Sequence, residues 1–239
     1  MRIFRQLLKA FYCCRVPVYR RALRVGSAAA IEHERLLLGM DFNTVVDVGA
    51  NRGQFSLVAR RCFPSANILS FEPLPGPAAI FSKVFSGDKL TTLFEVAVGP
   101  VAETTIMHVS ARDDSSSLLA ISSLQEENFP GTDEIGTTQI SVAPLGDFLN
   151  QQKLVSPALL KLDVQGFELE ALIGCESLLE KFEMVYCECS FIELYSSQKL
   201  AKDIIIWLST RGLHLVGVHN TSYDTDGRAI QADFLFSRI

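Results

Sequence analysis

From residue 44 onward, short apolar runs alternate with longer stretches in which apolar residues recur at helical spacing. Short runs bounded by turn residues are typical of strands, and the longer periodic stretches favour helices. Their alternation predicts a Rossmann-like α/β fold, a mostly parallel sheet with helices on both faces. The expected strands are 44–48, 68–71, 92–98, 159–164, 184–189, 213–218 and 230–236. The expected helices are 53–62, 78–85, 168–179 and 200–210.

This alternation breaks between about residues 101 and 156, where 104–109 and 139–142 predict short strands around a Ser- and Gly-containing stretch. Insertions at one end of such a sheet commonly carry specificity, so we expect substrate contacts here. Near the end of the chain, Asp226-Gly227 predicts a hairpin that joins the last two strands into an antiparallel pair.

The composition is that of a globular protein, since 48% of the 239 residues are hydrophobic and 21% are charged. No apolar run approaches the ~18–20 residues of a membrane span, so no transmembrane helix is expected. The six cysteines form no C-x-x-C pair and show no zinc-type spacing with the four histidines, so no metal site is expected. Without a secretion signal, we expect reduced thiols and a cytoplasmic location.

The net charge of −5 hides an asymmetry, because residues 1–30 carry seven Arg or Lys and no acid, which leaves −12 elsewhere. Among these cations, one face of an amphipathic helix is expected from Phe4, Leu7, Leu8, Phe11 and Tyr12. Two readings stay open: peripheral contact with an anionic membrane, or packing across the main domain with the arginines in solvent. An isoelectric point near 5.4 argues against a nucleic-acid partner. We divide the chain into a basic helical extension, 1–40, and one main domain, 41–239.

The strongest local signal is the segment 45–55, where an apolar strand runs into a glycine-bearing turn and then a helix. Glycines let the backbone turn sharply and approach a ligand, and open α/β sheets bind ligands at the carboxyl ends of their strands. The spacing of Gly49 and Gly53 differs from the dinucleotide pattern, and Asp47 ahead of them would repel a pyrophosphate. An acid there suits a cationic group, such as the ammonium of S-adenosylmethionine.

Two later strand ends extend this site. Glu72 lies 23 residues after Gly49, an offset at which acids hydrogen-bond ribose hydroxyls. The alternative for Glu72 is a solvated charge ahead of Pro73. Ala97 and Val98, at the end of the third expected strand, would offer apolar surface to an adenine ring.

Two carboxylates are candidate catalytic groups. Asp163 ends the fourth strand, where it would position the methyl donor or act as general base, unless it is a turn residue ahead of Gly166. Glu188 has the opposite strand parity to Cys187 and Cys189, which we expect to share a buried face. Glu188 is thus the second candidate base, with a solvated charge as the alternative.

Candidate substrate contacts follow from position alone. The insertion carries three consecutive serines, Ser115, Ser116 and Ser117, for which a solvated loop is the alternative. Tyr195 and Gln198, after the fifth strand, would border the acceptor. His219, at a strand end, is a reserve base.

Together these segments resemble the FkbM-type methyltransferase family over roughly residues 40–238. The matching motifs are Val46–Gly53, Phe71–Pro73, Ala97–Gly99, Ser115–Leu118, Leu160–Glu168, Glu188–Phe191 and Gln231–Phe236. The resemblance implies a class I methyltransferase sheet, with Asp47, Gly49, Asn51 and Glu72 holding the cofactor. Some family sequences have Glu where this chain has Gln165. The full predicted cofactor-binding set is Asp47, Gly49, Ala50, Asn51, Gly53, Phe55, Glu72, Ala97, Val98 and Asp163.

The resemblance also implies an S-adenosylmethionine-dependent O-methyltransferase that acts on a hydroxyl of a small molecule, sugar or glycan. Such an enzyme must align the oxygen with the methyl group and remove its proton, here through Asp163 or Glu188. An NAD-dependent oxidoreductase is disfavoured by the missing glycine pattern. A catalytically silent nucleoside-binding or scaffold protein would be expected to lose the acids of the site. The sequence carries no signal for the oligomeric state.

Overall fold

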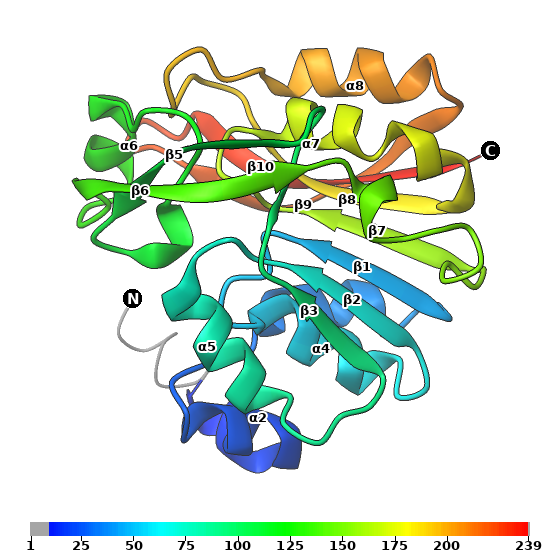
Figure 1. Ribbon diagram of the computed structural model, residues 1–239. Helices are drawn as coiled ribbons and strands as arrows, with labels where there is room; N and C mark the ends of the chain where they lie inside the picture. Colours follow the sequence, from blue (N-terminus) through cyan, green and yellow to red (C-terminus); the bar gives the residue numbers. More distant parts are fainter. Residues whose placement is uncertain (1–9, 239) are drawn as a thin grey trace.

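The computed structural model describes residues 10–238, and a seven-stranded sheet runs through its centre (Figure 1). Its strands are β1 (Thr44–Val48), β2 (Asn67–Phe71), β3 (Thr91–Phe94), β7 (Ala158–Leu162), β8 (Met184–Ser190), β9 (Leu213–Tyr223) and β10 (Ala229–Arg238). Their spatial order is β3-β2-β1-β7-β8-β10-β9. The first five are parallel, and β10 runs antiparallel to both β8 and β9. The predicted parallel sheet with an antiparallel C-terminal hairpin is confirmed.

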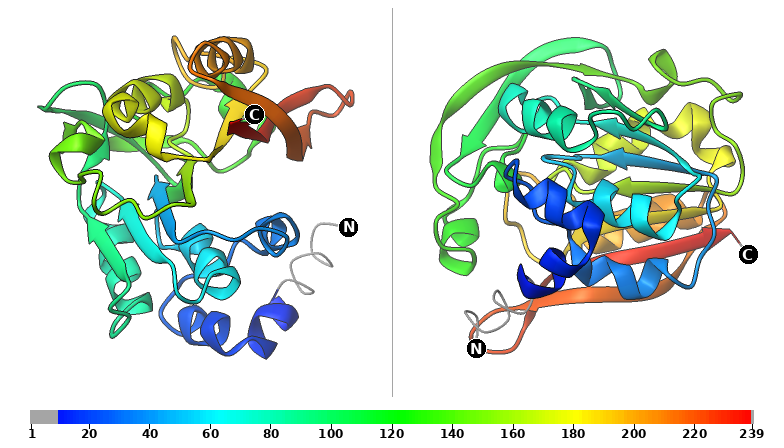
Figure 2. Two further views of the ribbon diagram at one scale, coloured as in Figure 1. Left: turned by 90° about the vertical axis from the view of Figure 1, so that its right-hand side faces the viewer. Right: turned by 90° about the horizontal axis from the view of Figure 1, so that it is seen from below.

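Helices cover both faces of this sheet (Figure 2). The α-helices are α2 (Pro17–Leu23), α3 (Glu34–Leu37), α4 (Gln54–Cys62), α5 (Pro75–Val84), α6 (Ser123–Asn128), α7 (Glu168–Gly174) and α8 (Ala201–Ser209). The 3-10 helices are η1 (Ile31–His33), η2 (Asp113–Ser115), η3 (Leu145–Asp147) and η4 (Glu176–Lys181). One face carries α2, α4 and α5, and the other carries α7 and α8.

Strand alternation divides the core into two clusters. Val45 packs with α4 and the N-terminal segment, whereas Val46 packs with α7 and α8. Every residue of β1 and β7 is buried, because both faces are covered. Polar residues within these strands are therefore buried too, and parity directs Asp47 and its strand neighbour Lys161 toward the α4 face.

A second, three-stranded sheet carries most of the insertion. Its strands, in the order β4-β6-β5, are β4 (Ala97–Val98), β5 (Glu103–Ser110) and β6 (Glu134–Ala143). The predicted single strand 92–98 is wrong, because the chain turns after Phe94, whose carbonyl accepts the Val96 amide at 3.0 Å. The two halves then join different sheets. The predicted helix 168–179 likewise divides, into α7 and η4.

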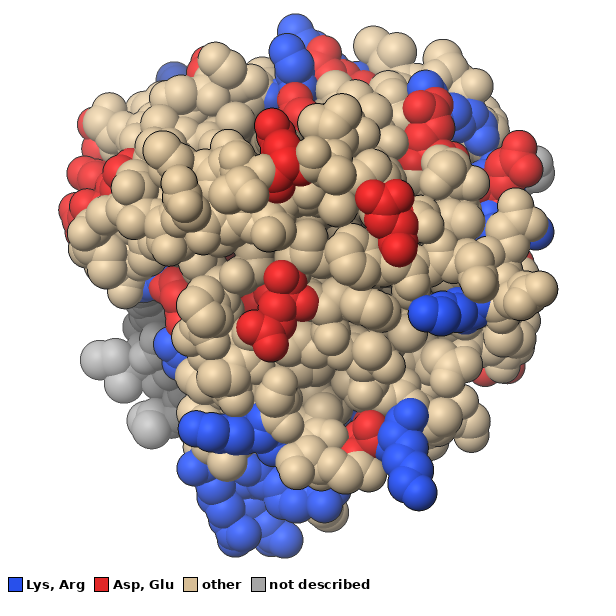
Figure 3. Space-filling view, in the orientation of Figure 1, with Lys and Arg blue, Asp and Glu red and all other residues tan. Residues whose placement is uncertain are grey.

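The N-terminal segment packs on the α4 face. Residues 10–15 are helical, and Tyr19 and Ala22 of α2 are buried in the same cluster as α4. Four arginines of this segment are exposed, Arg15, Arg20, Arg21 and Arg24, and basic side chains gather at the base of the molecule in Figure 3. Of the two readings, residues 10–24 follow the second: they pack across the main domain, and their arginines are exposed to solvent.

The structure does not test two expectations about the first residues, the amphipathic face of the helix and its contact with a membrane. Phe4, Leu7 and Leu8 lie outside the described residues, and the membrane contact stays a prediction. Within residues 10–238, no helix combines the length and the apolar character that crossing a bilayer demands.

Candidate active site

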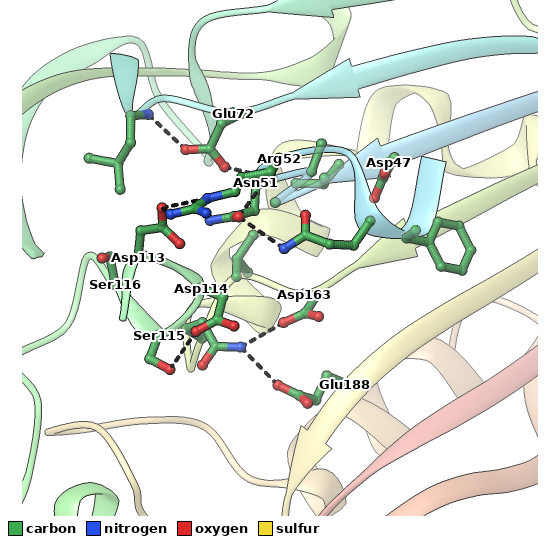
Figure 4. A pocket seen from close by; sticks show the side chains of 18 of the residues that line it. Asp47, Asn51, Arg52, Glu72, Asp113, Asp114, Ser115, Ser116, Asp163 and Glu188 are labelled. Carbon is green, nitrogen blue, oxygen red and sulfur yellow. Dashed lines mark hydrogen bonds and ion pairs between the residues drawn. The ribbon is translucent and has the colours of Figure 1, made fainter. Parts of the chain in front are cut away.

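A cavity of about 750 Å³ opens at the carboxyl ends of β1, β2 and β7 (Figure 4). Ligands bind at this edge in open α/β sheets, and small-molecule sites have volumes of roughly 300–1,000 Å³. The loops after these three strands line the cavity, together with β4, residues 111–116 and parts of the segment 26–33. The predicted residues on its wall are Asp47, Gly49, Ala50, Asn51, Phe55, Glu72, Ala97, Val98, Ser115, Ser116, Asp163 and Glu188.

The turn after β1 requires its first glycine. Gly49 has φ +82°, and a Cβ there would lie 1.9 Å from the carbonyl oxygen of Asp163. Only glycine therefore lets the ends of β1 and β7 approach so closely. Asn51 follows with φ +44°, and its backbone amide donates to Glu72 Oε2 at 2.9 Å. The glycine turn and the end of β2 are thereby joined.

Glu72 is buried at the end of β2, with 4% of its surface exposed. Its other oxygen accepts the Leu74 amide at 2.7 Å. Burial raises the pKa of Glu72 to about 7, although hydrogen bonds from these two backbone amides act to lower it. Each carboxylate oxygen keeps a further lone pair, so Glu72 can still accept a ligand hydroxyl.

Asp47 lies deeper than the sequence suggested. Its carboxylate accepts the Ser56 hydroxyl of α4 at 2.5 Å, and Ser56 also contacts Ser70 at 3.0 Å. Burial raises the pKa of Asp47 to about 6. Asp47 is thus a buried acid at the inner wall, anchored to α4.

Lys161 is a buried cation that the sequence analysis did not single out. It is 1% exposed, lies 3.4 Å from Asp163 and donates to the Leu162 carbonyl at 3.1 Å. Burial alone would lower the pKa of Lys161, but Asp163 and Asp233 hold it above its usual value. Burial would raise the pKa of Asp163, but Lys161 and the Gln165 amide hold it below its usual value. Both groups are therefore charged at neutral pH.

The amide of Gln165 joins the two candidate catalytic carboxylates (Figure 4). Its nitrogen donates to Asp163 at 2.7 Å and to Glu188 at 3.1 Å. The second oxygen of Glu188 accepts the Gln231 amide at 2.8 Å. Burial, then Asp163 and Asp233, raise the pKa of Glu188 well above its usual value. Two adjacent carboxylates thus have pKa values shifted in opposite directions.

Three predicted site residues support the wall without lining it. A Cβ at Gly53 would lie 2.7 Å from Phe85, so this glycine serves helix packing. The Ser117 hydroxyl is turned inward and donates to the Gln165 carbonyl at 2.6 Å. Tyr195 is 2% exposed, and its hydroxyl donates to Gln165 Oε1 at 2.8 Å. None of these three residues is on the cavity wall.

Two other candidates also lie away from the cavity wall. The Gln198 side chain accepts the amides of Leu194 and Tyr195 at 2.9 and 3.2 Å, which makes it a loop support. His219 packs beside the Tyr186 ring, with centroids 6.3 Å apart.

Some site residues had a signal in the sequence, and others had none. Lys161 is the only charged residue in a run of apolar residues, and a lysine buried in a sheet needs an acidic partner. Its pairing with an acid could therefore have been predicted from the sequence. Gln165 reaches both carboxylates because its backbone has φ +53°, which no pattern shows. His33 lines the cavity from the segment that the sequence assigned to an extension.

The cavity wall favours a cationic ligand. Seven Asp or Glu and three Arg or Lys line it. Each of these cations already contacts an acid of the wall, in the pairs Arg52–Asp113, Arg112–Asp114 and Lys161–Asp163. The buried Oε1 atom of Gln54 has no hydrogen-bond partner among the described residues. A ligand with an ammonium or sulfonium group fits this set of acceptors. Across residues 10–238, no three His, Cys, Asp or Glu are grouped to hold a metal ion.

A family model matches most of the chain. The model of the methyltransferase FkbM domain matches residues 47–215. The 2-O-methyltransferase NoeI of Sinorhizobium fredii is 26% identical over 77% of this chain and 79% of its own length. Methyltransferase 1 of Beauveria bassiana is 26% identical over 57% of this chain and 59% of its own length. Among solved structures, the precorrin-6y C5,15-methyltransferase of Geobacter metallireducens has a TM-score of 0.47 at 10% identity, over 86% of this chain and 87% of that one.

Proposed function

The chain belongs to the FkbM methyltransferase family, and on this basis we propose that it methylates a hydroxyl oxygen of a small molecule, sugar or glycan with S-adenosylmethionine. When bound, S-adenosylmethionine supplies a methyl group that is already activated on a sulfonium. The residues of the chain must then orient the acceptor oxygen and take up its proton. Similarity to a 2-O-methyltransferase supports a hydroxyl acceptor.

The cofactor is held by the ends of β1, β2 and β4. Glu72 accepts the ribose hydroxyls, for which its carboxylate keeps free lone pairs. Ala97 and Val98 offer apolar surface to the adenine ring. The acids of the wall balance the positive charges of the ligand, and the unpartnered oxygen of Gln54 can accept a hydrogen bond from its ammonium.

The placement of Asp163 and Glu188 on the cavity wall, where the Gln165 side-chain amide joins them, carries the proposal. A general base works best when its pKa lies near the working pH. Glu188, with its raised pKa, is the better proton acceptor, whereas Asp163 is held ionised by Lys161. We therefore assign proton uptake to Glu188 and alignment of the acceptor hydroxyl to Asp163. The proton of the hydroxyl moves to Glu188 as the oxygen takes the methyl group.

The acceptor approaches from the second sheet. Ser115 and Ser116 lie on that side of the cavity wall, beside Asp114. Groups at this position suit a polyhydroxylated acceptor, because the serine hydroxyls can donate and accept hydrogen bonds and the carboxylate can accept them.

Calorimetric titration with S-adenosylhomocysteine tests the cofactor half of the proposal. We expect binding by the wild type, and a marked loss in Asp47→Ala and in Glu72→Ala. Glu180→Ala, which removes an exposed acid, is the matched control. A folded wild type that binds neither S-adenosylhomocysteine nor S-adenosylmethionine would remove the proposal. Binding of a nicotinamide cofactor instead would support an oxidoreductase.

Transfer of a labelled methyl group tests the acceptor half. Glycan and small-molecule extracts are incubated with labelled S-adenosylmethionine and either the wild type or the Asp163→Asn/Glu188→Gln double variant. A product formed by the wild type alone, with a label that resists mild alkali, is the methyl ether that we expect. A label released by mild alkali would indicate a methyl ester, and therefore a carboxylate acceptor.

A further inference from the structure

Residues 26–33 form one side of the cavity, although they precede the part of the chain that matches the family model. The residues of this segment on the wall are Gly26, Ala28, Ala30, Glu32 and His33. Its backbone is fastened to the start of α4, where the Ala30 amide donates to the Gln54 carbonyl at 3.0 Å. Arg52 also donates to the Gly26 carbonyl at 3.3 Å. The segment is therefore held against the glycine turn.

His33, in η1, is fixed through one ring nitrogen. Its Nδ1 lies 3.0 Å from the Tyr186 hydroxyl and 3.2 Å from the Asn220 amide nitrogen. The ring meets Phe55 edge-on, with centroids 5.4 Å apart. These contacts come from β8, β9 and α4, and together they hold the imidazole in one orientation.

The contacts of His33 also determine where its proton lies. The same Asn220 nitrogen donates to Asp233 at 2.9 Å, which fixes the direction of the amide. An amide nitrogen only donates, so Nδ1 of His33 accepts from it at 3.2 Å, and the carboxylate oxygen of Asp233 lies farther from Nδ1, at 3.5 Å. Burial lowers the pKa of His33, so the ring is neutral near pH 7. Its single proton is therefore on Nε2, which makes Nε2 a hydrogen-bond donor.

A hydrogen-bond donor beside the glycine turn would suit the methionine end of the cofactor. That end carries an ammonium and a carboxylate. Acids and the Gln54 oxygen suit the ammonium, whereas Arg52, Arg112 and Lys161 are each engaged by an acid of the wall. A neutral imidazole donates to a carboxylate without repelling the sulfonium.

We propose that Nε2 of His33 donates a hydrogen bond to the carboxylate of S-adenosylmethionine. This inference rests on the proposed function and goes beyond it, because it assigns a cofactor contact to a segment outside the family match. His33 is then a binding residue, and Asn220 and Tyr186 position it.

The test compares S-adenosylmethionine with decarboxylated S-adenosylmethionine, which lacks only the carboxylate. Calorimetric affinities of both ligands are measured for the wild type and for His33→Ala. Hydrogen bonds to charged groups are strong enough that we expect S-adenosylmethionine to bind about ten- to hundredfold more weakly to the variant. Decarboxylated S-adenosylmethionine should bind both proteins alike, within about threefold, because the contact is already missing.

Two further variants separate the contact from its scaffold. His33→Gln keeps an amide donor near the position of Nε2 and should recover most of the lost affinity. Asn220→Gly keeps the positive φ of +49° and removes the amide, so it should cause a smaller loss, again confined to S-adenosylmethionine. His214→Ala removes an exposed histidine and is the control. Circular dichroism of each variant reports folding, and His33→Gln and Asn220→Gly carry the test if His33→Ala does not fold.

The outcomes distinguish a failure of the His33 contact from a failure of the proposed function. Equal weakening of both ligands in His33→Ala, or equal binding of both ligands by the wild type, would overturn the role of His33 and leave the proposed function intact. A folded wild type that binds neither ligand would remove the proposed function itself, and this inference with it.

Discussion

The ammonium of Lys161 lies 3.4 Å from the carboxylate of Asp163 at the inner wall of the cavity. The parallel register of β1 and β7 also places Asp47 beside Lys161 on the same sheet face. A lysine that is 1% exposed is stable only with such partners, and in return it keeps Asp163 ionised. Burial and acidic neighbours raise the pKa of Glu188, so Glu188 takes up a proton more easily than Asp163 does.

Lys161→Met should destabilise the protein more than an ordinary surface change. Removing one partner of a buried ion pair typically costs about 3–5 kcal/mol, because the remaining charge loses its compensation. Urea denaturation at pH 7 measures this loss of unfolding free energy. Lys202→Met, at an exposed position, should change it by no more than about 0.5 kcal/mol. Equal midpoints for Lys161→Met and the wild type would contradict the pairing.

Glu188→Gln should remove the acid limb of the pH–rate profile. In the wild type, turnover rises with pH as Glu188 loses its proton, and the raised pKa of Glu188 places this limb at a higher pH than an ordinary glutamate would. The variant should lose about 10²–10⁴-fold in turnover at the optimum and keep its affinity for S-adenosylhomocysteine. Initial rates at saturating cofactor, with the acceptor found by the labelling assay, report turnover and its pH dependence, and calorimetric titration reports the affinity for S-adenosylhomocysteine. An unchanged acid limb in Glu188→Gln would move proton uptake to another group.

Gln165→Met should separate catalysis from cofactor binding. The substitution preserves much of the side-chain volume but removes the amide that joins Asp163 to Glu188. Small errors in the position of reacting groups can cost about 10²-fold, so we expect a loss of that order in turnover. The dissociation constant of S-adenosylhomocysteine should change less than about threefold. If affinity and turnover fell together, Gln165 would belong to the cofactor site.

Glu168→Gln should change how stability depends on pH. Glu168 is 2% exposed, accepts the amides of Val164 and Gly166, and has a pKa that burial raises to about 7. Its folded-state pKa exceeds the unfolded value, so its stabilising effect is complete below about pH 4.5 and is lost as the pH rises through about 7. The variant should therefore gain stability relative to the wild type between these values, by roughly 2–4 kcal/mol.

Thermal or urea unfolding of both proteins across pH 4.5–8 measures this difference. Glu180→Gln, at an exposed position, should run parallel to the wild type throughout. A constant offset between Glu168→Gln and the wild type at every pH would show that Glu168 does not titrate as expected.

The sequence by itself determined the sheet and the edge where we propose that the cofactor binds. In a parallel sheet with both faces covered, each central strand is a continuous apolar run, so its end is visible as the first polar or glycine residue. Glu72 and Asp163 directly follow β2 and β7, and Asp47 is the next-to-last residue of β1. Because these strands are parallel, their carboxyl ends meet at one edge, and residues far apart in the chain become neighbours. Strand parity likewise separated Glu188 from the buried cysteines beside it.

Only the tertiary structure decided which side chains complete the site. The strand expected at 92–98 divides between two sheets, since an apolar run does not reveal a bend that packing imposes. Ser117 and Tyr195 turn away from the cavity to hold Gln165, because a side chain's direction depends on its neighbours across the fold. His33 joins the wall because its segment packs against α4. Sequence patterns describe residues that are neighbours along the chain. These contacts join residues that are far apart in the chain and meet only when the backbone folds.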